Sequence, residues 1–153
     1  MDSLQEGTTY TFNFGESIVD NNEGNPLPFF RYALSTGAII DSLEITGEIT
    51  DAYERITEPY TSIHLYPIDS THTDSTIFLK KPFYATSTLD SVIYNFKNLR
   101  PDTYEIIAIK DVGGNYLFDQ NLDKIGFLDK PITLPGLSLI HISEPTRPRL
   151  ISY

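Results

Sequence analysis

The chain has 153 residues, of which 40% are hydrophobic and 21% charged, so it can bury a core and is not expected to be disordered. Its net charge of −10 argues against nucleic acid or an anionic membrane as a partner, because both require clustered Lys and Arg. The absence of cysteine excludes disulfides, thiol catalysis and cysteine-bound zinc, and no stretch is apolar for long enough to insert into a membrane.

The first 37 residues predict a β-hairpin. Aromatic and polar residues alternate in Thr8–Phe14 and again in Phe30–Leu34, and the segment Asp20–Pro26 between them is rich in turn-forming residues. A lone hairpin is marginal in water, so we expect residues 1–37 to be the closing strands of a domain whose earlier strands lie outside this sequence. Residues 38–42 then read as a short linker.

Residues 43–136 predict a second module built from short strands and polar loops. The expected strands, in chain order, are residues 43–49, 62–66, 92–97, 104–110 and 131–134, and residues 77–86 are expected to be mostly extended, with a break at Pro82. Gly47 indicates either a bulge or a close approach of another group to the backbone. Strand 104–110 is apolar on both faces, so we expect it to be central and covered on both sides, whereas Pro131 places the last strand at an edge.

The final segment, residues 137–153, is set aside. Leu137–Arg147 resembles, residue for residue, the translation of a transposase-type sequencing-library adapter, and Ile151–Tyr153 matches the point where the constant adapter resumes after an index. Segments of this kind are excluded from reasoning about the fold. The alternative is a natural apolar strand at residues 137–142. We expect the natural protein to continue beyond Gly136.

The strongest candidate site is the loop that follows strand 104–110. Oxygen-bearing side chains surround its Gly-Gly turn, namely Asp111, Asn115, Asp119, Asn121 and Asp123. Calcium takes several carboxylate, amide and main-chain oxygens, so we predict a possible calcium site with Asp111, Asn115, Asp119 and Asp123 as ligands. The alternative is that these side chains cap turns by accepting hydrogen bonds from nearby backbone amides. No other cofactor is expected.

The remaining polar residues do not predict catalysis. Ser70, His72 and Asp74 lie too close together in one loop to converge from separate elements, as a catalytic triad requires. His64 has no cysteine or second histidine near it in the sequence, so we expect a structural residue at the surface or half-buried. The Gly-Gly turn lacks the lysine of a phosphate loop. We therefore predict that the chain is not an enzyme.

Two sets of segments resemble known bacterial modules. The segments Thr8–Phe12, Ile18–Asp20, Gly24–Leu27 and Phe30–Gly37 together resemble the closing strands of bacterial Ig-like domains in envelope and S-layer-type proteins. The segments Leu43–Thr50, Ser62–Pro67 and Asn98–Asp111 resemble prealbumin-like modules of the carboxypeptidase-regulatory-like and Cna-B-like kinds. In the latter, Gly47–Asp51 matches the opening Gly-x-[Ile/Val]-x-Asp, and Leu99–Tyr104 matches the turn Leu-x-Pro-Gly-x-Tyr, with Asp102 in place of Gly.

The resemblance also extends to the candidate loop. In the resembled modules this position often reads Lys-Asp-x-Asn-x-Asn, followed by two further aspartates, and Lys110, Asp111, Asn115, Asp119, Asp123 and Lys124 match that pattern. Gly113 departs from it, since Asn or Asp is expected there, and the departure removes one potential ligand.

These resemblances imply an all-β chain: an Ig-like or prealbumin-like antiparallel β-sandwich preceded by a truncated Ig-like hairpin. They also imply a non-catalytic structural or binding module of a bacterial cell-surface protein, similar to the envelope lipoproteins of Bacteroidetes-type bacteria. The expected location is the cell envelope or the extracellular space. The expected partners are neighbouring domains of the same chain, with other envelope components or glycans as further candidates. The alternative is an accessory domain of a secreted hydrolase that binds carbohydrate or positions a catalytic domain.

Overall fold

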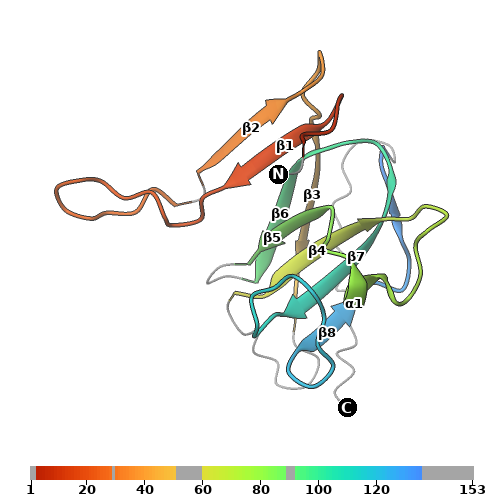
Figure 1. The fold of residues 1–153 in the computed structure, drawn as a ribbon. Coiled ribbons are helices and arrows are strands. Elements are labelled where there is room, and N and C mark those ends of the chain that lie inside the picture. The colour runs from red at the N-terminus through yellow and green to blue at the C-terminus, as the bar shows by residue number, and fades with distance from the viewer. Residues whose placement is uncertain (1–2, 29, 51–59, 89–91, 136–153) are drawn as a thin grey trace. The chain divides into compact units, whose positions relative to one another are not determined.

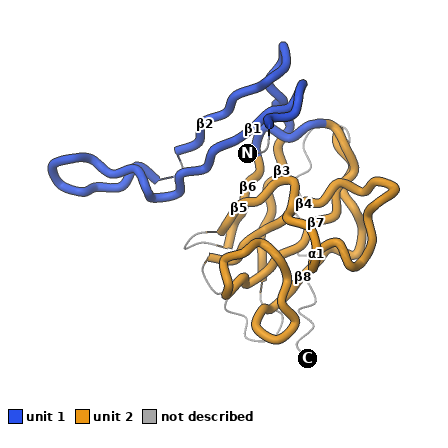
Figure 2. Tube along the Cα trace, in the orientation of Figure 1, with its two compact units in different colours: residues 1–43, 97–100 blue, residues 44–96, 101–153 orange. Residues whose placement is uncertain are grey.

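The computed structural model describes residues 3–28, 30–50, 60–88 and 92–135. The predictions for Asp51 and for the adapter-like tail at residues 137–153 therefore lie outside the described residues. The described part is almost entirely β-structure, which confirms the predicted all-β class (Figure 1). The chain divides into two compact units, residues 1–43 with 97–100 and residues 44–96 with 101–153 (Figure 2). Within the described residues, no helix combines the length and apolar character that a membrane span requires.

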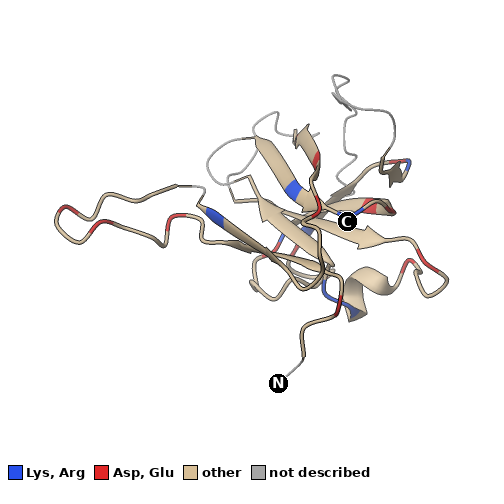
Figure 3. Ribbon diagram, turned by 90° about the horizontal axis from the view of Figure 1, so that it is seen from above, with Lys and Arg blue, Asp and Glu red and all other residues tan. Residues whose placement is uncertain are grey.

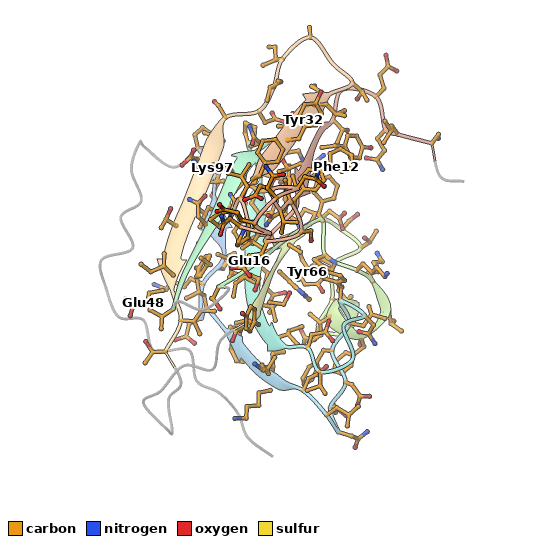
Figure 4. The ribbon with its side chains drawn as sticks, turned by 90° about the vertical axis from the view of Figure 1, so that its left-hand side faces the viewer. Phe12, Glu16, Tyr32, Glu48, Tyr66 and Lys97 are labelled. Carbon is orange, nitrogen blue, oxygen red and sulfur yellow. The ribbon has the colours of Figure 1, made fainter. Side chains whose placement is uncertain are left out.

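The first unit contains the predicted hairpin. Strands β1 (Thr9–Asn13) and β2 (Arg31–Ser35) pair antiparallel, with Phe12 opposite Tyr32. Because alternate residues of a strand share a face, the aromatic residues gather on one side of the hairpin. Phe12 and Tyr32 are 48% and 56% exposed and lie beside each other (Figure 4).

The hairpin connection is fastened by Asp20. Its carboxylate accepts hydrogen bonds from the backbone amides of Asn22, Glu23, Gly24 and Asn25 at 2.6–3.2 Å. These bonds, above all the one from Glu23, hold the pKa of Asp20 below its usual value. The predicted turn at residues 20–26 is confirmed, and an aspartate organises it by capping amides.

The second unit holds one sheet and most of another. A two-stranded sheet pairs β3 (Leu43–Glu48) with β6 (Ile93–Leu99). The larger sheet, called the β7 sheet below, has the strand order β5-β4-β7-β8, and β9 also pairs with β7. Its strands are β4 (Ser62–Pro67), β5 (Tyr84–Ser87), β7 (Thr103–Lys110), β8 (Lys124–Phe127) and β9 (Ile132–Thr133).

Strand β7 is the centre of its sheet. It lies between β4 and β8, and both of its faces bury apolar side chains. Tyr104 and Ile106 are buried on one face, where the register places them with Leu65 of β4. Ile107 and Ile109 are buried on the opposite face. The prediction of a central strand covered on both sides is confirmed.

The β3–β6 sheet has one buried and one polar side. Ile45, Tyr94 and Phe96 are buried, whereas Asn95 Nδ2 on the polar side donates to Thr46 Oγ1 at 2.8 Å. A Cβ added at Gly47 would lie 2.3 Å from Tyr94 Oη, so no larger residue fits beneath this ring. This confirms the second of the two alternatives predicted for Gly47, a close approach.

Two predictions about local structure are wrong. The segment 77–86, expected to be extended, begins as the short helix α1 (Thr76–Leu79), and only β5 is a strand. Phe78 packs on Phe118 with ring centroids 5.3 Å apart, and this tertiary contact prevails over the strand preference of the sequence. Strand β8 was not predicted, because its four residues are too few to show an alternation.

Candidate functional site

One face of the β7 sheet carries the polar groups of the candidate site, and we call it the loop face. Three rungs define it: Ser62 opposite Ile109, His64 opposite Ile107, and Tyr66 opposite Glu105. By the same alternation, Asp111 follows on this face, just beyond the end of β7. The loop face thus leads directly to the first residue of the predicted calcium loop.

The loop face is closed by other parts of the same chain. Tyr66, Ile107 and Ile109 form a buried cluster, against which Ile77 of α1, Phe118 and Ile125 pack. We call residues Asp111–Asp123 the covering loop, because Phe118 from this loop lies on the cluster. The Phe118 amide also donates to the carbonyl of Ile77 at 3.0 Å, which ties the covering loop to α1.

Asp111 fastens the first half of the covering loop. Its Oδ1 accepts from the amides of Gly114 at 2.7 Å and Asn115 at 3.3 Å, and its Oδ2 accepts from the Tyr116 amide at 2.7 Å. The turn needs left-handed backbone at Gly114 (φ 64°) and at Tyr116 (φ 62°). Glycine adopts this conformation without strain, whereas tyrosine does so only when its surroundings hold it there.

Asp123 closes the second half of the loop. Its Oδ1 accepts from the amide of Val112 at 2.9 Å and its Oδ2 from the amide of Asp119 at 2.8 Å, so one carboxylate joins the two ends. Asp119 Oδ1 accepts from the Asn121 amide at 2.9 Å, and Asn115 Oδ1 from the Leu117 amide at 2.7 Å.

All four predicted calcium ligands are therefore used as turn caps in this structure, as the alternative interpretation proposed. In the described part of the chain, no three His, Asp or Glu side chains gather closely enough to hold a metal ion. Calcium also takes amide and main-chain oxygens, so the calcium site at Asp111, Asn115, Asp119 and Asp123 remains a prediction. Figure 3 shows Asp and Glu in red, and many of them lie in loops and turns.

His64 occupies a different place from the one predicted. It was expected at the surface or half-buried, but its side chain is 0% exposed. Its Nε2 lies 2.9 Å from Ser62 Oγ and its Nδ1 lies 3.4 Å from Tyr66 Oη, so both ring nitrogens have hydroxyl partners. Burial lowers the pKa of His64 to about 4, although the nearby charge of Asp111 acts in the opposite direction.

At the other end of the loop face, a histidine contacts a carboxylate. His72 Nε2 lies 2.9 Å from Glu105 Oε2, so His72 faces the sheet instead of forming a site with Ser70 and Asp74. Burial, and then the charge of Glu105, raise the pKa of Tyr66 to about 12. The phenol of Tyr66 therefore stays protonated at neutral pH and can donate a hydrogen bond to His64.

The row Ser62, His64 and Tyr66 was missed as a unit by sequence reasoning. The signal was available, because residues spaced by two in a predicted strand share one face. What the sequence could not show is that Tyr116, from a loop some fifty residues later, lies over His64 with ring centroids 5.8 Å apart. A serine hydroxyl bonded to histidine resembles half of a catalytic triad, but here the second ring nitrogen meets a phenol instead of a carboxylate.

Comparison with known proteins finds no matching family model, no matching curated protein and no matching solved structure.

Proposed function

We propose that this chain is a non-catalytic structural or binding module of a bacterial cell-envelope or extracellular protein. The sequence resemblance to Ig-like and prealbumin-like surface modules motivates the proposal, and the β-sandwich architecture is compatible with it. The module would connect neighbouring domains of a longer chain and present its surfaces to other envelope components.

The observation that carries this proposal is how the covering loop uses its polar groups. Asp111 and Asp123 together accept five hydrogen bonds from backbone amides of the same loop. Their charge therefore serves to hold a long loop on the loop face, where Phe118 closes the apolar cluster. Asp20 does the same in the hairpin connection. Acidic residues that organise turns stabilise a scaffold and require no substrate.

A second candidate function is carbohydrate binding, as in an accessory domain of a secreted hydrolase. The observation that favours it is the aromatic face of the hairpin, where Phe12 and Tyr32 are opposite each other and about half exposed. Exposed aromatic rings on a sheet are suitable surfaces on which a sugar ring could stack. The same rings would equally serve as a surface for a neighbouring domain.

Two experiments test these proposals. Antibodies raised against the purified chain should label intact cells of the source bacterium as strongly as permeabilised cells if the module lies on the cell surface, and labelling only after permeabilisation would refute a surface location. Retention of the chain on insoluble polysaccharides, such as peptidoglycan, chitin and cellulose, separates the two candidate functions. A scaffold module should not be retained. Retention that the double variant Phe12→Ala/Tyr32→Ala abolishes, and that the control Ile93→Ala keeps, would establish carbohydrate binding instead.

A further inference from the structure

The loop face contains a buried histidine under a thin cover. His64 is 0% exposed, whereas the ring of Tyr116, 5.8 Å away, is 46% exposed. Tyr116 thus has one side toward His64 and the other toward solvent. Tyr116 belongs to the covering loop, so the loop supplies a ring contact between His64 and solvent.

The segment around Tyr116 is less firmly held than the strands beneath it. Strand β4, which carries His64, pairs with β7 along its whole length and with β5 over Ser62–Leu65. The Tyr116 amide is bonded to the Asp111 carboxylate, and its φ of 62° is unfavourable for a residue with a side chain. Loops of this kind open at lower free energy than central strands. The covering loop is therefore the element that would yield if His64 became charged.

The charged groups around His64 come from two directions. Asp111 lies beyond the Ser62 rung, and Glu105 lies beside Tyr66, where it is paired with His72. The elements on either side contribute uncharged groups: Ala85 of β5 lies opposite His64, and Ile125 of β8 packs on the cluster. The charge of Asp111 favours a proton on His64, yet burial prevails and lowers its pKa to about 4. A proton bound to the covered ring is thus unfavourable unless water reaches it.

We propose that the covering loop is an acid-released cover, which leaves the loop face when His64 is protonated. The open state lets water solvate the imidazolium, and it also relieves the left-handed backbone at Tyr116. Opening uncovers the buried cluster around Ile107, so at acidic pH this module exposes an apolar surface that is closed at neutral pH.

The size of the effect follows from the two states of the ring. If His64 titrates near 4 when covered and near its ordinary 6.5 when solvated, the open population rises about 30-fold between pH 7.5 and pH 5. The amide of Phe118 is a suitable reporter, because its bond to the carbonyl of Ile77 ties the covering loop to α1 and involves no carboxylate.

The test is hydrogen exchange by NMR, with each rate converted to a protection factor relative to the unstructured chain at the same pH. We expect protection of the Phe118 amide to fall about 30-fold from pH 7.5 to pH 5, while the amides of β7 keep larger protection factors than Phe118 at both pH values. His64→Gln, which keeps a polar group in the strand, should remove this fall. His72→Gln is the matched control and should keep it.

Three outcomes would overturn the proposal. Equal protection of the Phe118 amide at both pH values would show that the loop stays closed. The physical reason would then be that the ring face of Tyr116 holds the imidazolium in place. A fall that persists in His64→Gln would assign the opening to another group. Protection factors in β7 that are no larger than that of Phe118 would show that the loop opens only when the whole unit unfolds.

Discussion

Replacing Gly47 with alanine tests the packing of the β3–β6 sheet at its tightest point. In most strands a glycine-to-alanine change stabilises by about 0.4–1 kcal/mol, because the unfolded chain loses freedom. Here the new methyl group would lie 2.3 Å from Tyr94 Oη and 2.4 Å from Cζ, more than an ångström inside ordinary contact. The Tyr94 ring is 6% exposed and cannot swing into solvent without emptying its place in the core. Overpacking of this kind costs about 1–3 kcal/mol, so we expect a net loss of about 1–2 kcal/mol.

The assay is urea unfolding followed by circular dichroism, in a double-mutant cycle with Tyr94→Leu. Leucine removes the phenol end that the new methyl group would meet, so Gly47→Ala should cost nothing, or stabilise, in that background. The coupling between the two sites should therefore lie in the range of about 0.5–3 kcal/mol found for residues in contact. A Gly47→Ala variant that is more stable than the parent would refute the reasoning, because it would show that the ring is not fixed above the backbone.

Three further predictions concern the second unit and the tail. Ile107→Ala should destabilise by about 2–5 kcal/mol in the same assay. The control Ile93→Ala, at an exposed position, should cost less than about 0.5 kcal/mol. Equal losses would show that the buried cluster on the loop face is not a core. Because the pKa of His64 is lowered to about 4, the unfolded state binds its proton first, so stability should be full above pH 6.5 and fall by about 3 kcal/mol toward pH 4. A pH profile of His64→Gln that falls as steeply as that of the parent would contradict this. Removing residues 137–153 should change stability by less than about 0.5 kcal/mol, and a loss of several would mean that the adapter interpretation is wrong.

The strands were predictable where the alternation of apolar and polar residues was long enough to indicate only a strand. In β7, apolar residues occupy both the even and the odd positions of Tyr104–Ile109. This pattern indicates a strand buried on both faces, and the register and burial of the strand confirm it. The hairpin alternation around Phe12 was equally clear. In contrast, β8 and α1 have only four residues each. The structure of β8 depends on pairing with β7, and that of α1 on the contact with Phe118, and neither contact can be predicted from the local sequence.

The candidate site shows the same division. The aspartates of the covering loop were identified from the sequence, and two roles were predicted for them. Whether they bind a cation or accept hydrogen bonds from backbone amides depends on the path of the backbone. That path depends on a left-handed conformation at Tyr116, which the sequence does not signal because tyrosine seldom adopts it. The burial of His64 also follows from this path, since the ring that covers it belongs to the same residue.

The measurement that tests the central claim most directly is the unfolding free energy of Asp123→Ala in chelator and in millimolar calcium. Asp123 joins the two ends of the covering loop through the amides of Val112 and Asp119, and no cation is needed for these bonds. We therefore predict that the variant loses roughly 1–3 kcal/mol in chelator, with the same loss in calcium, whereas Asp129→Ala, at an exposed position, loses almost nothing. A parent that is stabilised by calcium, together with a variant that equals the parent in chelator, would contradict the account and establish the calcium site instead.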